Sequence, residues 1–154
     1  MTELFSRIVS DVLSPFVRRP KRYQVAALCF REKSPGRKEV LLITSRDTGR
    51  WILPKGWPIN GFDAPGTALQ EAWEEAGVKG AAPDPEPIGS YEYEKMLDGG
   101  LPVTCHTDVY RVKVAKLAED YPEISERRRE WMTPQRAAEL VNEPGLKDLL
   151  RHFS

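Results

Sequence analysis

The sequence predicts a mixed α/β fold in a single domain that covers residues 1–154. Segments with strand patterns and segments with helix patterns interleave along the chain, which is typical of α/β proteins. Hairpin signals join several strands, so the sheet should contain antiparallel pairs rather than repeated βαβ units. With 154 residues, of which 40% are hydrophobic, the chain is long enough to bury a core without covalent staples.

The N-terminal segment predicts a short amphipathic helix over about residues 2–13. Its apolar residues recur at helical spacing and form one stripe. Pro15 and Pro20 then break the pattern. We expect this helix to pack on the domain, because its polar face lacks the basic residues typical of a membrane-surface helix.

A hairpin is predicted next. Residues 23–31 are mostly apolar and indicate a strand, residues 34–36 (Ser-Pro-Gly) form a turn, and residues 39–45 return as a second strand. A third, short strand over residues 51–53 should stop at Pro54, because proline cannot donate a ladder hydrogen bond.

The clearest helix is predicted over residues 63–76. Asp63 can cap its N-terminus, Pro65 suits its first turn, and Gly77 can end it.

The second half of the chain predicts another hairpin and two helices. Strands over residues 91–96 and 103–114 flank the Asp-Gly-Gly sequence at 98–100, which is a hairpin signal. Helices over residues 133–141 and 145–153 complete the chain, the first of them with a Thr-Pro start signal.

Composition excludes several classes of partner. The formal net charge is zero, so no nucleic-acid partner is expected and anions must be attracted by local clusters. No apolar run approaches the roughly 20 residues that span a bilayer, and the N-terminus lacks the pattern of a secretory signal. Cys29 and Cys105 lie in apolar stretches without metal-ligand spacing, which predicts two reduced core thiols. We therefore expect a cytoplasmic protein without a membrane partner.

Three carboxylates crowd one side of the predicted helix. Glu71 and Glu75 are four residues apart and Glu74 is three from Glu71, so all three lie within about one turn and repel one another. A solvated acidic face is the simplest interpretation of this cluster alone. Hard oxygen ligands also suit Mg²⁺, which typically binds one or two carboxylates together with substrate phosphates.

The surrounding sequence resembles the Nudix box, G-x5-E-x7-R-E-U-x-E-E-x-G-U, where U is a bulky aliphatic residue. Six residues stand on its fixed positions with the right spacing: Gly56, Glu71, Glu74, Glu75, Gly77 and Val78. The resemblance implies a Nudix fold, an α/β/α sandwich around a mixed β-sheet. It also implies a loop–helix–loop metal site.

The chain departs from this pattern at three positions. Phe62 replaces the usual Glu, Gln70 replaces the usual Arg, and Ala72 is small for its position. In the family the Glu and Arg are understood to brace the loop against the helix. Because losing both leaves no unpaired charge, we expect Phe62 to pack in place of the ion pair.

The resemblance also implies roles for individual residues. Glu71 and Glu75 would hold Mg²⁺, or Mn²⁺ as an alternative, together with a backbone carbonyl near Lys55 and Gly56. Glu74 would be the general base that takes a proton from the attacking water. The alternative is a base from outside the box, and two residues that follow it in the sequence, Glu123 and Glu126, are open as candidates.

Segments over roughly residues 21–140 resemble the diphosphoinositol polyphosphate phosphohydrolases, among them residues 23–31, 40–46, 50–54, 74–80 and 129–131. This resemblance implies a small phosphorylated substrate, either a diphosphoinositol polyphosphate or a long dinucleoside polyphosphate. It places five residues at phosphate contacts: Arg22, Ser45, Arg46, Arg127 and Arg129. Two interpretations stay open: hydrolysis of other nucleoside derivatives, such as ADP-ribose, nucleoside triphosphates or capped RNA, and a domain that binds a nucleotide without cleaving it. Residues 127–129 are also compatible with a solvated charge run.

Overall fold

The computed structural model describes residues 20–79, 82–96 and 99–153. The predicted helix over residues 2–13 lies outside the described residues. The strands are β1 (Arg22–Ser34), β2 (Arg37–Thr44), β3 (Trp51–Ile52), β4 (Lys55–Gly56), β5 (Val78–Lys79), β6 (Gly89–Met96), β7 (Pro102–Lys113), β8 (Lys116–Leu117) and β9 (Arg129–Met132). The helices are α2 (Ala64–Ala76), α3 (Pro134–Leu140) and α4 (Pro144–Arg151). None of the described helices is long and apolar enough to cross a bilayer.

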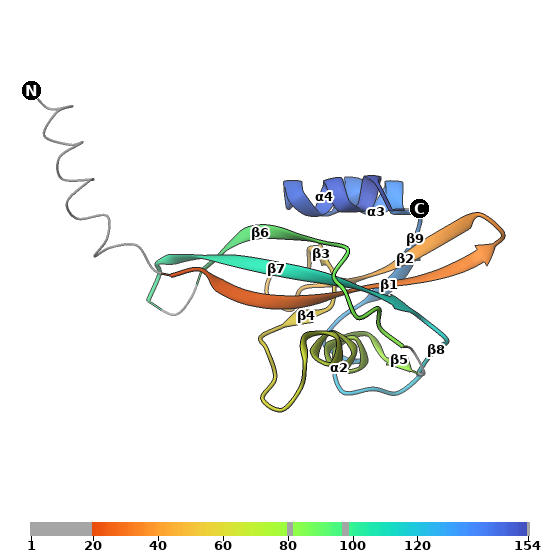
Figure 1. Cartoon of the computed structure of the whole chain (residues 1–154), viewed down its shortest axis with the longest axis horizontal. Coiled ribbons are helices and arrows are strands. Elements are labelled where there is room, and N and C mark those ends of the chain that lie inside the picture. Colours follow the sequence, from red (N-terminus) through yellow and green to blue (C-terminus); the bar gives the residue numbers. More distant parts are fainter. Residues whose placement is uncertain (1–19, 80–81, 97–98, 154) are drawn as a thin grey trace, which may run out of the picture.

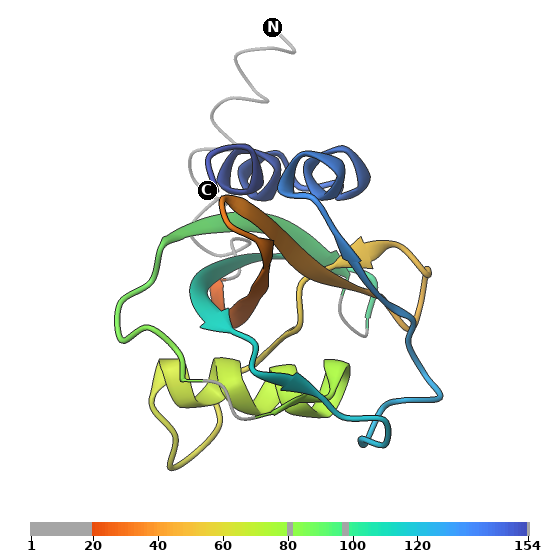
Figure 2. The same ribbon diagram turned by 90° about the vertical axis from the view of Figure 1, so that its right-hand side faces the viewer.

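The main sheet is mixed and lies between two layers of helix. Its strand order is β3-β2-β1-β7-β6, with β4 paired to β1 and β9 paired to β2. Strands β1 and β7 run parallel, whereas β1 pairs antiparallel with β2 and β4. Helices α3 and α4 cover one face, and α2 covers the other (Figures 1 and 2). The α/β/α sandwich around a mixed sheet is therefore confirmed.

The central strand β1 is buried on both faces. Its seven residues 24–30 are all buried, which is typical of a strand with helices on each side. Successive side chains point to opposite faces, so Leu28 and Phe30 join the core beneath α3 and α4. Val25 and Cys29 join the core beneath α2. This alternation ties both helical layers to one strand.

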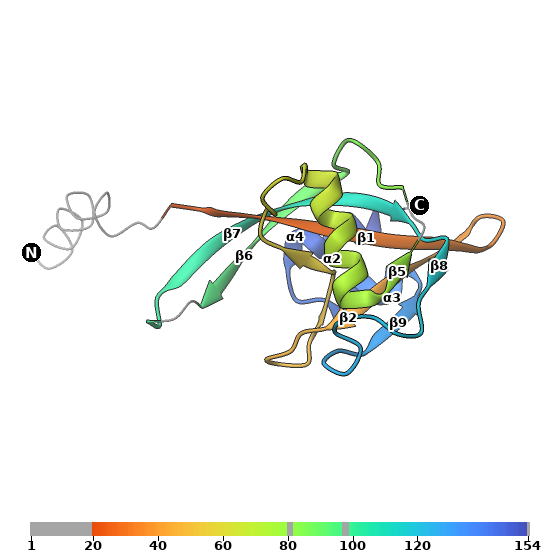
Figure 3. The ribbon, with the colours of Figure 1, turned by 90° about the horizontal axis from the view of Figure 1, so that it is seen from below.

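Helix α2 begins and ends where the sequence predicts. The Asp63 side chain accepts a 2.7 Å hydrogen bond from the Gly66 backbone N–H, and Gly77 ends the helix with a φ of 72°. Ala68, Ala72 and Ala76 form its fully buried stripe against the sheet. The small side chain at position 72 therefore allows close approach of helix and sheet. Figure 3 shows α2 lying across β1, with β5 and β8 near its C-terminal end.

The structure adds four short strands to the predicted set. Strands β4, β5 and β8 have two residues each and β9 has four, too few for a hydrophobic period to be recognised in the sequence. They exist because of long-range partners: Val25 of β1 pairs with Gly56 of β4, and Leu41 of β2 pairs with Trp131 of β9. These pairings fix the two segments that flank the carboxylates of α2.

The expectation that Phe62 packs in place of the missing ion pair is wrong. Its side chain is 49% exposed. The Phe62 backbone N–H donates a 3.0 Å hydrogen bond to the Ile59 carbonyl oxygen, and its ring belongs to neither cluster of the core. Phe62 therefore contributes little to the core, and the loop before α2 is held by other contacts.

Replacement of Gly77 by alanine should destabilise the protein more than replacement of Gly36. Both residues have positive φ, 72° and 76°, where an L-residue costs about 1–2 kcal/mol. Of the two, Gly77 is crowded, because an added Cβ would lie 2.6 Å from the Tyr121 ring and 2.7 Å from the Arg129 guanidinium, whereas nothing lies within 4 Å at Gly36. Urea unfolding of Gly77→Ala and Gly36→Ala measures the difference. Equal losses of free energy of unfolding would show that the surroundings of Gly77 relax without cost.

Candidate active site

A cavity of about 530 Å³ opens beside the carboxylates of α2. It is bounded by loop 45–50, strand β4, the α2 helix, the end of β6 and the segment 118–128 between β8 and β9, which we call loop 118–128. Loop 118–128 is fastened to the helix, because the Glu123 backbone N–H donates a 3.0 Å hydrogen bond to the Glu74 carbonyl oxygen. It is fastened to β2 by a 3.0 Å bond from the Thr44 N–H to the Arg128 carbonyl oxygen.

Two of the three predicted carboxylates line this cavity. Glu71 and Glu75 do so together with Glu123, whereas Glu74 does not. The Glu74 carboxylate instead accepts a 3.1 Å hydrogen bond from the Gln70 amide. Glu123, one of the two alternatives to Glu74 as general base, therefore lies on the cavity wall and Glu74 lies off it.

Glu75 is held by the backbone of β4. Its side chain is nearly buried, and one carboxylate oxygen accepts a 3.0 Å hydrogen bond from the Lys55 N–H. Lys55 stands at this position because it pairs with Ala26 of β1. The sheet thus places a backbone donor at the middle of the acidic cluster.

Gly56 lies against the Glu71 carboxylate, which would have to shift to admit a side chain at position 56. An added Cβ would be 2.4 Å from the carboxylate carbon of Glu71, well inside van der Waals contact. Among the described residues, none donates a hydrogen bond to this carboxylate. Gly56 therefore leaves room for a carboxylate that protein donors do not satisfy, and a bound cation would fit that requirement.

Burial and mutual repulsion disfavour the charged forms of these carboxylates. Burial, followed by the charges of Glu75 and Glu74, raises the pKa of Glu71 to about 7. Burial also raises the pKa of Glu75 to about 7, although Arg127 and the Lys55 N–H act in the opposite direction. The described residues hold no ready-made group of three His, Cys, Asp or Glu side chains for a metal ion. The donor set fits Mg²⁺ through two carboxylates, with backbone, substrate and water completing the coordination.

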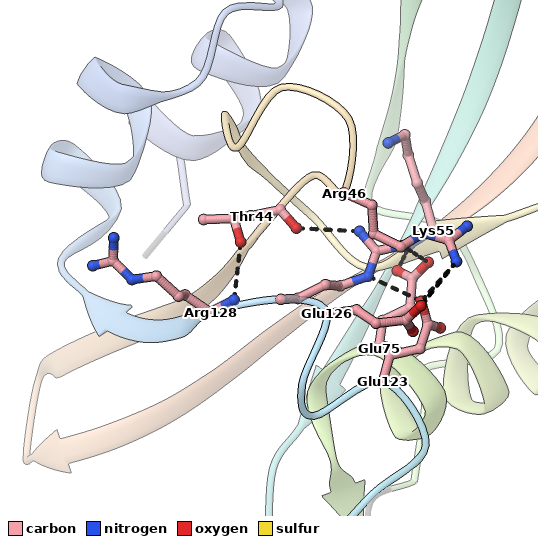
Figure 4. A network of polar contacts seen from close by, with 8 residues as sticks. Thr44, Arg46, Lys55, Glu75, Glu123, Glu126 and Arg128 are labelled. Atoms are coloured by element: carbon pink, nitrogen blue, oxygen red, sulfur yellow. Dashed lines mark hydrogen bonds and ion pairs between the residues drawn. The ribbon is translucent and has the colours of Figure 1, made fainter.

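Cationic side chains surround the carboxylates. Arg127 donates hydrogen bonds of 3.2 Å to the carboxylates of Glu75 and Glu123, and Arg46 lies 3.6 Å from Glu123. Lys55 extends over the Tyr93 ring at 5.3 Å, and burial lowers the pKa of its ammonium to about 8. In Figure 4, Arg46, Lys55, Glu75 and Glu123 gather at one side of the network.

The five residues expected at phosphates do not all meet at the cavity. Ser45, Arg46 and Arg127 line it, whereas Arg22 and Arg129 do not. Arg22 is exposed at the start of β1.

Arg129 has a different role from the one expected. Its guanidinium donates 2.8 Å hydrogen bonds to the carbonyl oxygens of Ala76 and Ala118, and it stacks on the Tyr121 ring at 4.6 Å. Carbonyl oxygens at the C-terminus of a helix attract cations, so Arg129 stabilises the end of α2 rather than the wall of the cavity.

The cavity wall also contains residues that the sequence did not single out, among them Arg50, Trp57, Tyr93 and Lys95. Tyr93 and Lys95 are two apart on β6 and therefore point to the same face of the strand, a signal that the sequence does contain. Trp57 follows Gly56 of the box directly, and its ring is 40% exposed with the Lys95 ammonium 5.2 Å above it. Arg50 has no such signal, because it is placed by an ion pair with the distant Glu143.

The family model described as NUDIX domain matches residues 20–153. Nudix hydrolase 16, mitochondrial, of Arabidopsis thaliana is 32% identical over 118 residues, which cover 73% of this chain and 63% of that protein. Diphosphoinositol polyphosphate phosphohydrolase 3-beta of Homo sapiens is 34% identical over 121 residues, covering 77% of this chain and 68% of that protein. The chain thus spans less than two thirds of the length of these plant relatives. It covers 63% of Nudix hydrolase 16 and 58% of Nudix hydrolase 12, mitochondrial, of the same plant.

Solved structures with low sequence identity share the fold. The Ap4A hydrolase of C. elegans, in a binary complex, has a TM-score of 0.65 at 20% identity and covers 84% of this chain and 93% of its own. The NUDIX domain of Shewanella oneidensis NrtR, complexed with ADP ribose, has a TM-score of 0.60 at 17% identity. The match covers 92% of this chain and 94% of that domain. The chain therefore belongs to the Nudix family.

Proposed function

We propose that this protein hydrolyses a phosphoanhydride bond with the help of Mg²⁺, in a diphosphoinositol polyphosphate or a long dinucleoside polyphosphate. Nudix hydrolases generally use divalent metal ions. The observation that carries the proposal is the pair Glu71 and Glu75, two partly buried like charges on the wall of a cavity that five basic side chains also line. The names of relatives and structural neighbours support the two substrate classes.

Each group in the cavity has a task in this proposal. Glu71 and Glu75 would hold the metal ion with a carbonyl of the Lys55–Gly56 segment. When bound, Mg²⁺ would neutralise charge on the phosphoryl oxygens during transfer. Arg46 would bind phosphates with its exposed guanidinium fork. Glu123, which lines the cavity beside α2, is better placed than Glu74 to take the proton of the attacking water.

The charge of the cavity favours the dinucleoside polyphosphate. Its wall carries five basic residues, Arg46, Arg50, Lys55, Lys95 and Arg127, and five acidic ones, Asp47, Glu71, Glu75, Glu94 and Glu123, so their formal charges cancel. A polyphosphorylated inositol concentrates many negative charges on one ring and needs a basic wall to match. A dinucleoside polyphosphate carries fewer charges per unit of its length, and the exposed Trp57 ring offers a stacking surface for one of its bases.

Removal of the metal should abolish hydrolysis, and Mg²⁺ should restore it.

The effect of Mg²⁺ on the stability of the folded protein should depend on pH. Because the pKa of Glu71 and Glu75 is raised from 4.5 to about 7, the metal-free folded state binds more protons than the unfolded state between these values. These two groups therefore lower the free energy of unfolding as pH rises from about 4.5 to 7. Mg²⁺ removes that penalty, so it should raise Tm more at pH 8 than at pH 5.5.

Thermal scans with Mg²⁺ or EDTA at both pH values provide the measurement. The matched control is Glu71→Gln, in which both the pH dependence and the Mg²⁺ effect should shrink. Equal stabilisation by Mg²⁺ at the two pH values would argue against metal binding by these carboxylates.

Glu123→Gln should lower kcat by about 10²–10⁴, because the amide keeps the volume of the side chain but cannot accept the proton. Glu74→Gln should lower kcat much less, since Glu74 lies off the cavity wall. Single-turnover rates of both variants at saturating Mg²⁺ separate the candidates. The reverse order of losses would return the base to Glu74.

Trp57→Leu should raise KM for a long dinucleoside polyphosphate by about 5- to 150-fold, the equivalent of one base stacked on an aromatic ring. KM for a diphosphoinositol polyphosphate, which has no aromatic ring, should stay within about twofold. Phe62→Leu is the matched control, because Phe62 is an exposed ring on the same loop that does not line the cavity. Steady-state kinetics on both substrates test this, and a wild-type preference for the inositol compound would overturn the substrate assignment.

A further inference from the structure

Arg127 has a buried side chain, and each of its three guanidinium nitrogens donates a hydrogen bond. Its side chain is 7% exposed. Nη2 donates to one carboxylate oxygen of Glu75, Nε donates to Glu123, and Nη1 donates to the Thr44 carbonyl oxygen, each at 3.2 Å. These partners belong to α2, to loop 118–128 and to the end of β2, so one planar group joins three elements of the site.

The Glu75 carboxylate is consequently held from two sides. One oxygen accepts from Arg127 and the other accepts a 3.0 Å bond from the Lys55 N–H. A carboxylate with both oxygens bonded to fixed donors has its plane and direction set before any ligand arrives. Such outer contacts orient metal ligands in many proteins.

Arg46 differs from Arg127 in each respect that matters for binding a substrate. The Arg46 side chain is 57% exposed, and its contacts to Glu123 and Glu126 are longer, at 3.6 and 3.7 Å. Its guanidinium can turn towards a phosphate at little cost. Arg127 could do so only by giving up bonds to partly buried carboxylates, which would leave charges without partners.

The α2 helix has few other ionic restraints on this side. Gln70 is uncharged and bonds to Glu74 within the helix, and Phe62 is exposed. In the described part of the chain, the ion pair that joins an α2 side chain to a neighbouring segment is that of Glu75 with Arg127.

We propose that Arg127 is a positioning residue, which orients the Glu75 carboxylate for a divalent ion, holds the Glu123 carboxylate beside it, and does not bind the phosphates of the substrate. This inference rests on the proposed metal-dependent function. It assigns the two arginines of the cavity wall to different tasks: Arg46 serves the substrate and Arg127 serves the metal ligands.

Mn²⁺ binding to the full chain, followed by electron paramagnetic resonance without substrate, tests the inference apart from catalysis. Arg127→Met should weaken Mn²⁺ binding by about 10- to 100-fold, as loss of an outer contact does in other metal sites. At saturating metal, kcat should fall while KM changes by less than about threefold. Arg127→Lys should restore only part of the affinity, because an ammonium cannot reproduce a planar fork with three bonds.

Arg128→Met is the matched control, with the same loss of charge at the adjacent residue. Arg128 is exposed and bonds to Thr44 through its backbone N–H, and in Figure 4 its side chain points away from the carboxylates. Its Mn²⁺ affinity and kinetics should match those of the wild type. A loss as large as that of Arg127→Met would show that net charge alone is responsible and would overturn the inference.

The remaining outcomes are distinct. Wild-type protein that binds no Mn²⁺ would overturn the proposed function together with this inference. Unchanged Mn²⁺ affinity in Arg127→Met, with a raised KM, would overturn the inference alone and make Arg127 a phosphate ligand. If Arg127→Met does not fold by circular dichroism, Arg127→Lys decides, and full wild-type Mn²⁺ affinity in that variant contradicts a geometric role.

Discussion

Two like charges on one turn of α2, Glu75 buried and Glu71 partly buried, are the constraint around which the rest of the site is arranged. Glu71 and Glu75 repel each other and lose hydration. Both effects disfavour the charged forms of the two carboxylates, so each makes glutamate an unfavourable residue at these positions. The neighbouring structure reduces this cost without neutralising the pair. Gly56 makes room for one carboxylate, the Lys55 N–H binds the other, and Arg127 supplies a positive charge. Among the described residues, the Glu71 carboxylate still has no hydrogen-bond donor, so it is free to bind a cation.

The three consecutive arginines 127–129 illustrate how an extended segment distributes its side chains. Neighbouring residues in such a segment point in opposite directions. Arg127 and Arg129 both turn towards α2, one to the Glu75 carboxylate and the other to the Ala76 carbonyl oxygen. Arg128 turns away and lies over the Trp51 ring. The helix is therefore held at its acidic side and at its negative C-terminal end by two arginines of one segment.

Much of this architecture could be predicted from the sequence, because periodicity and caps are local properties. The hairpin of β1 and β2 and the limits of α2 between Asp63 and Gly77 agree with the prediction. The two-residue strand β4 could not be predicted, since it exists only through its pairing with β1. At the site, the resemblance to the Nudix box predicted Glu71 and Glu75, and both line the cavity. The same resemblance could not predict which groups Arg129 contacts or that Phe62 is exposed, because both depend on how distant segments pack.

The parallel pairing of β1 with β7, from Arg22 opposite Cys105 to Phe30 opposite Lys113, has a consequence for how the protein acquires its fold. Strands β2 and β4, which lead into two walls of the cavity, both pair with β1, and the other partner of β1, β7, is synthesised much later. Contacts of such high contact order form slowly, because a long loop must close before they contribute. The wall formed by β6 is therefore added late, when β7 pairs with β1, whereas Glu71 and Glu75 already share one turn of α2.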